Sequence, residues 1–359
     1  KYFKKLTVGR VQTPTLAMLV ERAGQISNFQ KEKYFNVELD CDGIPAVKQK
    51  IFDPDEAEQL RSRCQGGEAI VTAVKETEKK VKAPKLYDLT TLQREANRIY
   101  GMTAKQTLDT AQSLYEKKLI TYPRTDSQYL TEDMEQTARN VVRQIYEKYQ
   151  LTGPFDQPEQ PDVKKVMNNS KVTDHHAIIP TMELASCHLD ELKSWEEKIL
   201  FLIAVHTVMA MSKDHIYQET EIEVECQEEI FKAKGKIVLQ DGWKLFENCF
   251  KNKDRMAIVD PDQEMKERMP KVTQGQTFYA VDAEKTEHFT SPPKPYSEDT
   301  LLAAMETAGN KEFDEDTEKK GLGTPATRAG IIEKLIYSQY ATRKGKQILP
   351  TDDGKVLVE

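Results

Sequence analysis

The sequence predicts an α+β protein with more than one domain, in which a helical block interrupts a β-rich region. Hydrophobic and polar residues alternate from residue 35 to 74 and again from 220 to 281, which is the period of strands. Between these stretches, residues 90–212 carry hydrophobic residues at helical spacing. The chain has 359 residues, of which 38% are hydrophobic and 31% charged, so it is long enough to bury several cores.

Local signals predict the elements in chain order. Residues 13–23 are expected to form a helix, because Pro14 suits a first turn and leucines follow at helical spacing. Further along, Thr103 is predicted to cap a helix, and residues 199–211 form an apolar helix that we expect to be buried. The proline-rich run 291–295 predicts a rigid boundary, after which helical sequence returns.

Charge is unevenly distributed along the chain. The net charge of −7 argues against unspecific binding of polyanions by the whole surface. Residues 1–33 and 75–124 are nevertheless basic, whereas 214–229 and 312–318 are acidic. A basic groove on an acidic body suits a protein that binds a nucleic-acid backbone along one track, although a solvated charged face is an alternative. The second basic stretch includes Lys79, Lys80, Lys82, Lys85, Arg94 and Arg98.

Cysteine usage and hydropathy indicate the compartment. The five cysteines are widely separated and form no Cys-x-x-Cys pair, so neither a disulfide framework nor a zinc site is predicted. No apolar run approaches the roughly 20 residues that span a bilayer. We therefore expect a reduced, cytoplasmic protein with no membrane contact. The chain does not begin with Met, and we expect it to be part of a longer protein.

The segment from Leu119 to Ser127, Leu-Ile-Thr-Tyr-Pro-Arg-Thr-Asp-Ser, presents a candidate nucleophile. Pro123 favours an extended conformation at Tyr122, so Tyr122, Arg124 and Asp126 are expected on one side. A phenol has a pKa of about 10 and is a weak nucleophile at neutral pH. A neighbouring guanidinium, here that of Arg124, stabilises the phenolate and can hold a phosphate. Asp126 is expected to orient this guanidinium. The alternative is a half-buried structural tyrosine.

Four segments together resemble motifs of the type IA DNA topoisomerases, in that family's order. They are Gly9–Leu16 (GRVQTPTL), Leu119–Ser127, Thr173–Thr181 (TDHHAIIPT) and Gly321–Ile332 (GLGTPATRAGII). The Thr-Pro-Thr and Asp-His-His-Ala-Ile-Ile-Pro wording is most like bacterial topoisomerase III. The resemblance implies a toroidal core with helical base and catalytic domains joined by a β-rich arch. The implied domains are 1–32 and 291–359 for the base, 33–86 and 216–290 for the arch, and 87–215 for the catalytic-tyrosine domain.

The resemblance also implies a reaction and a set of site residues. Such enzymes cleave one DNA strand through a 5′-phosphotyrosine, here at Tyr122, pass another strand, and religate without ATP. Arg124 would neutralise the phosphate and His175 would hydrogen-bond it; the alternative for His175 is a structural histidine. The residues that would contact single-stranded DNA are Arg10 and Gln12 before the first helix, and Thr324, Thr327 and Arg328 at a helix start. An ordinary capped helix is the alternative for the last three.

The family's Mg²⁺ site lies in a Toprim domain, which we expect to precede this chain in the longer protein. The acidic run Asp314–Glu318 has a similar spacing but is predicted to be a surface loop, so no metal ligand is expected here. The fragment alone would then bind single-stranded DNA and cleave poorly. We expect a monomer in the bacterial cytoplasm, associated with the nucleoid, whose partners are single-stranded DNA and its own Toprim domain. The alternative functions are a non-catalytic DNA-binding module and, less consistent with the GRVQ segment, a tyrosine recombinase.

Overall fold

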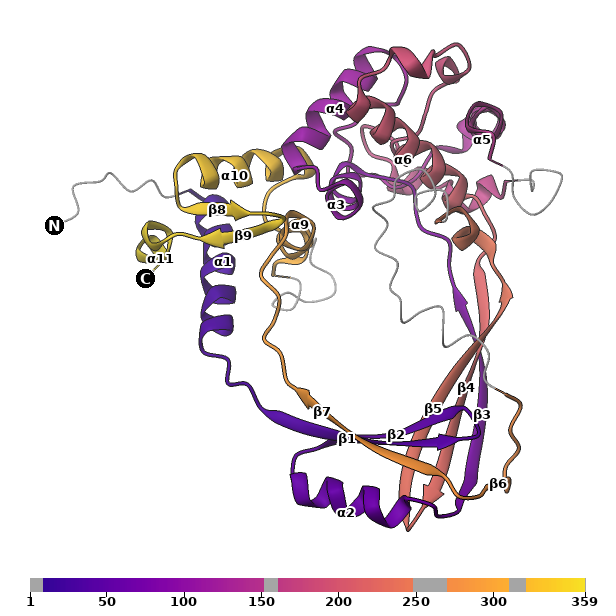
Figure 1. The fold of residues 1–359 in the computed structure, drawn as a ribbon. Coiled ribbons are helices and arrows are strands. Elements are labelled where there is room, and N and C mark those ends of the chain that lie inside the picture. The colour runs from indigo at the N-terminus through magenta and orange to yellow at the C-terminus, as the bar shows by residue number, and fades with distance from the viewer. Residues whose placement is uncertain (1–8, 152–160, 248–269, 310–320, 359) are drawn as a thin grey trace.

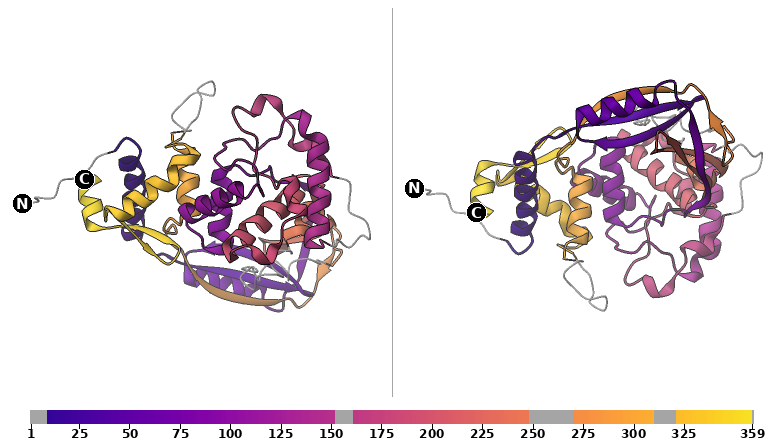
Figure 2. Two further views of the ribbon diagram at one scale, coloured as in Figure 1. Left: turned by 90° about the horizontal axis from the view of Figure 1, so that it is seen from above. Right: turned by 90° about the horizontal axis from the view of Figure 1, so that it is seen from below.

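The computed structural model describes residues 9–151, 161–247, 270–309 and 321–358. Its elements form a ring in which two groups of helices are joined by a long, curved sheet (Figure 1). The two further views show the two helical groups side by side from above and from below (Figure 2). The predicted α+β multidomain fold is confirmed.

The first group of helices, which we call the base, combines the beginning and the end of the described chain. Its elements are α1 (Gln12–Ser27), α9 (Glu298–Thr307), α10 (Pro325–Tyr337), β8 (Ala341–Lys344), β9 (Gln347–Pro350) and α11 (Asp352–Val358). Leu16 and Leu19 of α1 pack in one hydrophobic cluster with Leu301 of α9 and Ile332 of α10. The predicted helix at residues 13–23 is confirmed, and it extends by one residue at its start and four at its end.

The arch is a seven-stranded antiparallel sheet in the order β6-β3-β4-β5-β2-β1-β7. Its strands are β1 (Lys33–Cys41), β2 (Ile44–Ile51), β3 (Ala69–Val81), β4 (His215–Cys226), β5 (Glu229–Gln240), β6 (Thr277–Phe278) and β7 (Asp282–Phe289). A helix that sequence periodicity did not predict, α2 (Pro54–Cys64), packs its buried Ala57, Leu60 and Cys64 against the sheet. Asp53 caps this helix and Pro54 opens it.

The end of the arch at the base is a single pair of antiparallel strands, and β3, β4 and β5 together form the other end. Lys33 of β1 pairs with Phe289 of β7 where the sheet meets the base. Val81 of β3 pairs with His215 of β4 where it meets the second group of helices (Figure 1). The chain enters and leaves the second group at adjacent strand ends, and residues 242–246 after β5 pack against it as well.

The second group, which we call the helical block, surrounds one long buried helix. It contains α3 (Leu89–Tyr100), α4 (Ala104–Glu116), α5 (Glu135–Tyr149) and α6 (Ser194–Ala210). The predicted apolar helix is α6, in which every residue from Ile199 to Ala210 is buried. The predicted cap is also confirmed, because the Thr103 side chain accepts a hydrogen bond from the Gln106 N–H. The short 3₁₀ helices are Glu132–Met134, Val163–Val166, Asn169–Lys171, Met182–Ala185, Leu189–Glu191 and, beside β5, Gly242–Phe246.

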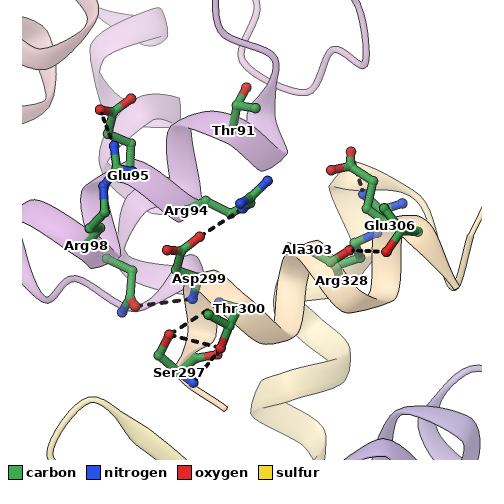
Figure 3. A network of polar contacts seen from close by, with 12 residues as sticks. Thr91, Arg94, Glu95, Arg98, Ser297, Asp299, Thr300, Ala303, Glu306 and Arg328 are labelled. Atoms are coloured by element: carbon green, nitrogen blue, oxygen red, sulfur yellow. Dashed lines mark hydrogen bonds and ion pairs between the residues drawn. The ribbon is translucent and has the colours of Figure 1, made fainter. Parts of the chain in front are cut away.

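The base and the helical block meet where α9 and α10 contact α3 and α4, a contact we call the seam (Figure 3). Several of its contacts are polar, beside apolar packing of Ala104 in the cluster of the base. Arg94 of α3 donates from Nε to Asp299 of α9 at 2.8 Å. Glu298, which is 3% exposed, accepts from the Ala104 N–H at 2.6 Å and from Arg343 of β8 at 2.9 Å.

Among the described residues, none of the helices is both long enough and apolar enough to cross a bilayer.

Candidate active site

The backbone around the tyrosine motif is fixed by pairing with the histidine motif. Ile120 forms an isolated antiparallel bridge with Pro180. Thr121 donates its N–H to the Ile179 carbonyl at 3.0 Å, and its hydroxyl donates to the Ala177 carbonyl at 2.9 Å while accepting from the Ile179 N–H at 3.0 Å. Two segments almost 60 residues apart are thereby held in register immediately before Tyr122.

This register places the Tyr122 and His175 rings in contact. Their centroids are 4.3 Å apart and the ring planes are tilted by 43°. The Thr125 hydroxyl, from the same motif as Tyr122, donates to the His175 carbonyl at 3.0 Å and fixes the backbone there. Tyr122 is half-buried and His175 is exposed, so a phosphate can approach both rings from solvent.

A second tyrosine, which the sequence analysis did not select, packs against the nucleophile candidate. The Tyr115 ring contacts the Tyr122 ring edge-on, with centroids 5.4 Å apart. Between them α4 ends in a tight turn, in which Lys118 adopts a φ of +62° and the Leu119 N–H donates to the Leu114 carbonyl. In the sequence, the only sign of this contact is the short spacing between Tyr115, near the end of α4, and Tyr122. That spacing is too common to predict a contact.

Side chains after Tyr122 alternate between solvent and interior, as the extended conformation predicts. Arg124 and Asp126 are exposed, whereas Pro123, Thr125 and Ser127 are buried. In the part of the chain that the structure describes, no ion pair joins Arg124 to Asp126. The guanidinium is thus accessible to an anion, and its orientation by Asp126 stays a prediction.

The predicted helix start at residues 323–325 forms, with Thr324 at the cap position. Its backbone N–H and the Thr327 hydroxyl are 2.9 Å apart and hydrogen-bonded in a capping box. Both threonines are exposed. The helix start is capped in the ordinary way. The contact of the two threonines with DNA stays a prediction.

Arg328 lies elsewhere than the sequence analysis expected. It is 3% exposed rather than facing solvent, and its Nη1 donates to the Thr90 hydroxyl of α3 at 2.9 Å. Its Nε donates to the Leu322 carbonyl at 3.1 Å. In this state Arg328 joins α10 to the helical block across the seam, because the capping turn directs the side chain inward. A phosphate contact requires it to exchange these partners.

Leu89 connects the seam to the tyrosine motif. Thr90, which receives Arg328, follows Leu89, and the Leu89 N–H donates to the Thr125 carbonyl at 3.1 Å. Beside them, Asp88 caps α3 and is 6% exposed. Burial raises the pKa of Asp88 to about 6, against the opposing effect of hydrogen bonds from Thr91.

Arg10 and Gln12 lie at the start of α1, which packs against α10. Arg10 is exposed. Gln12 is 5% exposed, and among the described residues neither polar atom of its amide has a hydrogen-bond partner. A buried unpaired amide is costly, so Gln12 is suited to a partner that enters this site.

The described residues provide no metal site. Among them, no group of three or more His, Cys, Asp or Glu side chains is close enough to hold an ion. The acidic run Asp314–Glu318, predicted to be a surface loop, lies outside the described residues.

Comparison with known proteins identifies the family to which this site belongs. A family model described as "DNA topoisomerase" matches residues 1–359. The chain belongs to this family. The resemblance of its four motifs to type IA topoisomerases is thereby confirmed.

The relatives of this topoisomerase chain agree on the subtype. It is 38% identical to DNA topoisomerase 3 of Bacillus licheniformis and 37% identical to that of Bacillus subtilis, over 100% of this chain and 51% of each relative. The Salmonella typhimurium DNA topoisomerase 3 is 33% identical over 98% of this chain and 56% of the relative. The chain thus spans about half the length of these relatives.

Among solved structures, full-length topoisomerase I of Thermotoga maritima matches the fold with a TM-score of 0.73 and 25% identity. The match covers 99% of this topoisomerase chain and 55% of the other chain. The roles of individual site residues stay predictions.

Proposed function

We propose that this chain is the nucleophile-bearing part of a type IA DNA topoisomerase. Tyr122 attacks a phosphodiester of single-stranded DNA, and its oxygen becomes bonded to the 5′ phosphate. The bond to the 3′ oxygen breaks, the phenol loses one proton, and the leaving 3′ hydroxyl gains one. The contact between the Tyr122 and His175 rings is the observation that carries the proposal.

Each neighbouring group has a task in this step. The exposed Arg124 guanidinium neutralises charge on the non-bridging oxygens, and the exposed His175 ring hydrogen-bonds the same phosphate. Religation reverses the attack. It needs no ATP because the phosphotyrosine conserves the energy of the phosphodiester.

We expect Mg²⁺ to bind in a Toprim domain of the longer protein. The donor set of the described residues does not fit a Mg²⁺ site, so no step is routed through the ion in this chain. Cleavage by the chain alone is therefore expected to be weak until that domain is supplied.

Adduct trapping tests the proposal. The chain is mixed with a separately supplied Toprim domain, Mg²⁺ and single-stranded oligonucleotides labelled at either end. A 5′-phosphotyrosine retains the 3′-labelled half on the protein, whereas a 3′ link, as in tyrosine recombinases, retains the 5′ label. Tyr122→Phe should abolish the adduct, and Tyr115→Phe, which changes the adjacent ring, should retain it.

DNA binding without any adduct, in the presence of a folded Toprim domain, would replace the proposal by a non-catalytic single-stranded DNA-binding module.

A further inference from the structure

A cavity of about 280 Å³ lies at the seam, between the helical block and the base. One face of α3 lines it, because Thr91, Arg94, Glu95 and Arg98 follow one another at helical spacing. Asp299 of α9 lines the side that belongs to the base. Figure 3 shows Arg94 and Asp299 joined between the two helices, with Thr91 and Glu95 pointing away from α9. The remaining lining comes from residues 84–87, Gln128 and His206.

Both arginines of the cavity have donors to spare. Arg94 uses Nε for Asp299 at 2.8 Å, and Arg98 uses Nη2 for Glu95 at 2.7 Å. A guanidinium has five N–H donors. Among the described residues, the Nη groups of Arg94 and the Nε and Nη1 groups of Arg98 have no further hydrogen bond. Figure 3 shows the Arg94 Nη groups pointing away from Asp299. Such free edges match two oxygens of one phosphate.

The balance of charge in the cavity is positive. Lys85 is exposed and adds a third cation to the two arginines, against the carboxylates Glu95 and Asp299. Glu95 already accepts from the Tyr87 hydroxyl as well as from Arg98. Burial lowers the pKa of His206, so this residue adds no charge at neutral pH. A net positive cavity with unused guanidinium donors favours an anion.

The cavity adjoins the tyrosine motif in the sequence, which indicates that its anion is a phosphate of the DNA strand. Gln128 lines the cavity and directly follows Ser127, the last residue of the motif. The six peptide units that join Tyr122 to Gln128 span at most about 20 Å. A DNA strand that leaves the nucleophile along this segment reaches the cavity within a few nucleotides.

We propose that this cavity is a phosphodiester subsite for single-stranded DNA, in which Arg94 and Arg98 hold one phosphate. The inference rests on the proposed function, since the ligand is the same DNA strand. Arg94 exchanges Asp299 for the phosphate, so binding removes one contact between α3 and α9. Asp299 is then a competitor of DNA as well as a partner of Arg94.

The test is equilibrium binding of a labelled single-stranded oligonucleotide to the chain over a range of salt concentrations. Arg94→Gln and Arg98→Gln should each weaken binding about tenfold. Each should also reduce the slope of log K against log salt concentration by about 0.7, the value for one phosphate contact on a single strand. Asp299→Asn should have the opposite effect and tighten binding, because it removes the competitor.

Arg139→Gln is the matched control. Arg139 has the same exposure as Arg94, 35%, and a similar ion pair, with Glu135 at 2.7 Å, but lies on α5 away from the cavity. Its replacement should leave affinity and salt slope unchanged. Thermal melting of each variant checks that it is folded.

The signs of the changes decide the outcome. If Arg94 only joins α3 to α9, Arg94→Gln and Asp299→Asn will change binding in the same direction, and the subsite is overturned. If the wild type binds DNA but the Arg94 and Arg98 variants keep its salt slope, the subsite is overturned and the proposed function is not. Failure of the wild type to bind overturns the proposed function with it. Equal losses on a duplex of the same length would assign the cavity to double-stranded DNA instead.

Discussion

At the scale of single residues, Asp88 combines structural support with a sensitivity to pH. Its carboxylate accepts from the Thr91 N–H at 2.7 Å at the start of α3, and it lies beside Arg328 and Glu306 of the base. Because burial raises the pKa of Asp88 to about 6 from 3.8, the folded state holds a proton that the unfolded chain releases.

The first prediction concerns this proton. A raised folded-state pKa stabilises the protein below the unfolded pKa, and that contribution is lost as pH rises through about 6. Asp88→Asn retains a capping oxygen but cannot titrate. Relative to it, the wild type should lose up to about 3 kcal/mol of stability between pH 4 and pH 7. Chemical denaturation at several pH values measures this, and parallel curves for the two proteins would contradict it.

Thr125 gives a second prediction at this scale. Its hydroxyl donates to the His175 carbonyl, so Thr125→Val removes the bond that holds His175 beside Tyr122 while keeping side-chain volume. The yield of covalent adduct should fall about tenfold, the effect of one misplaced catalytic contact. DNA affinity should stay nearly constant. An equal loss of affinity and adduct would show that Thr125 serves DNA binding rather than orientation of His175.

At the scale of elements, α4 positions both the seam and the nucleophile. It starts at Ala104, whose N–H contacts Glu298, and it ends in the turn that leads to Tyr122. Its start depends on the capping box of Thr103 and Gln106, in which each side chain accepts from the other's backbone N–H.

The third prediction therefore targets the cap of α4. Thr103→Ala should destabilise the protein by about 1 kcal/mol, because the Gln106 N–H loses its partner. Thr110→Ala is the control, since Thr110 is half-buried within the same helix and its hydroxyl, among the described residues, bonds only to the Gln106 carbonyl. Denaturation midpoints measure both changes. Equal midpoints for the two variants would show that tertiary packing alone fixes the start of α4.

Sequence periodicity predicted the long elements and missed the short contacts, for a physical reason. Helix α6 is buried along its whole apolar stretch, and strands such as β1 and β5 alternate in burial, which makes them recognisable. The Ile120–Pro180 bridge is an isolated pair with no period. It was the family resemblance, and not a local pattern, that associated Tyr122 with His175. Helix α2 was missed although Asp53 and Pro54 signal its start, because strand alternation dominates its surroundings.

Burial of polar side chains was the other limit of prediction. Arg328 follows a good helix start, which suggested a contact with DNA, but whether a side chain turns inward depends on the partner helix. Thr90 and the seam supply that partner from more than 200 residues away. The domain boundaries and the roles of the site residues stay predictions.

At the scale of the whole molecule, the ring is closed by the seam on one side and the arch on the other (Figure 1). The seam depends on Glu298, a nearly buried carboxylate that contacts both the helical block and Arg343 of the base. Arg343 also pairs with Glu333 of α10, within the base.

The fourth prediction compares Glu298, which contacts both groups of helices, with Glu333, which pairs with Arg343 inside the base. Glu298→Ala leaves the Ala104 N–H and one edge of Arg343 unpaired and should weaken the seam by about 2 kcal/mol. The radius of gyration, measured by small-angle X-ray scattering, should increase as more molecules open. Glu333→Ala breaks the other ion pair of Arg343 without touching the helical block and should leave the radius unchanged. An increase in both variants would locate the effect in the base.

The pairing of Val81 with His215 has a consequence for engineering. Because the chain leaves and re-enters the sheet at adjacent positions, the helical block is a cassette: its two ends already lie at the spacing that a β-hairpin turn bridges. A two-residue Asn-Gly link between Val81 and His215 would join β3 directly to β4 and retain their register. The excised residues 82–214 bring most of their hydrophobic core, and Trp243, Leu245 and Phe246 complete it, so an exchange between homologues replaces residues 242–246 together with residues 82–214.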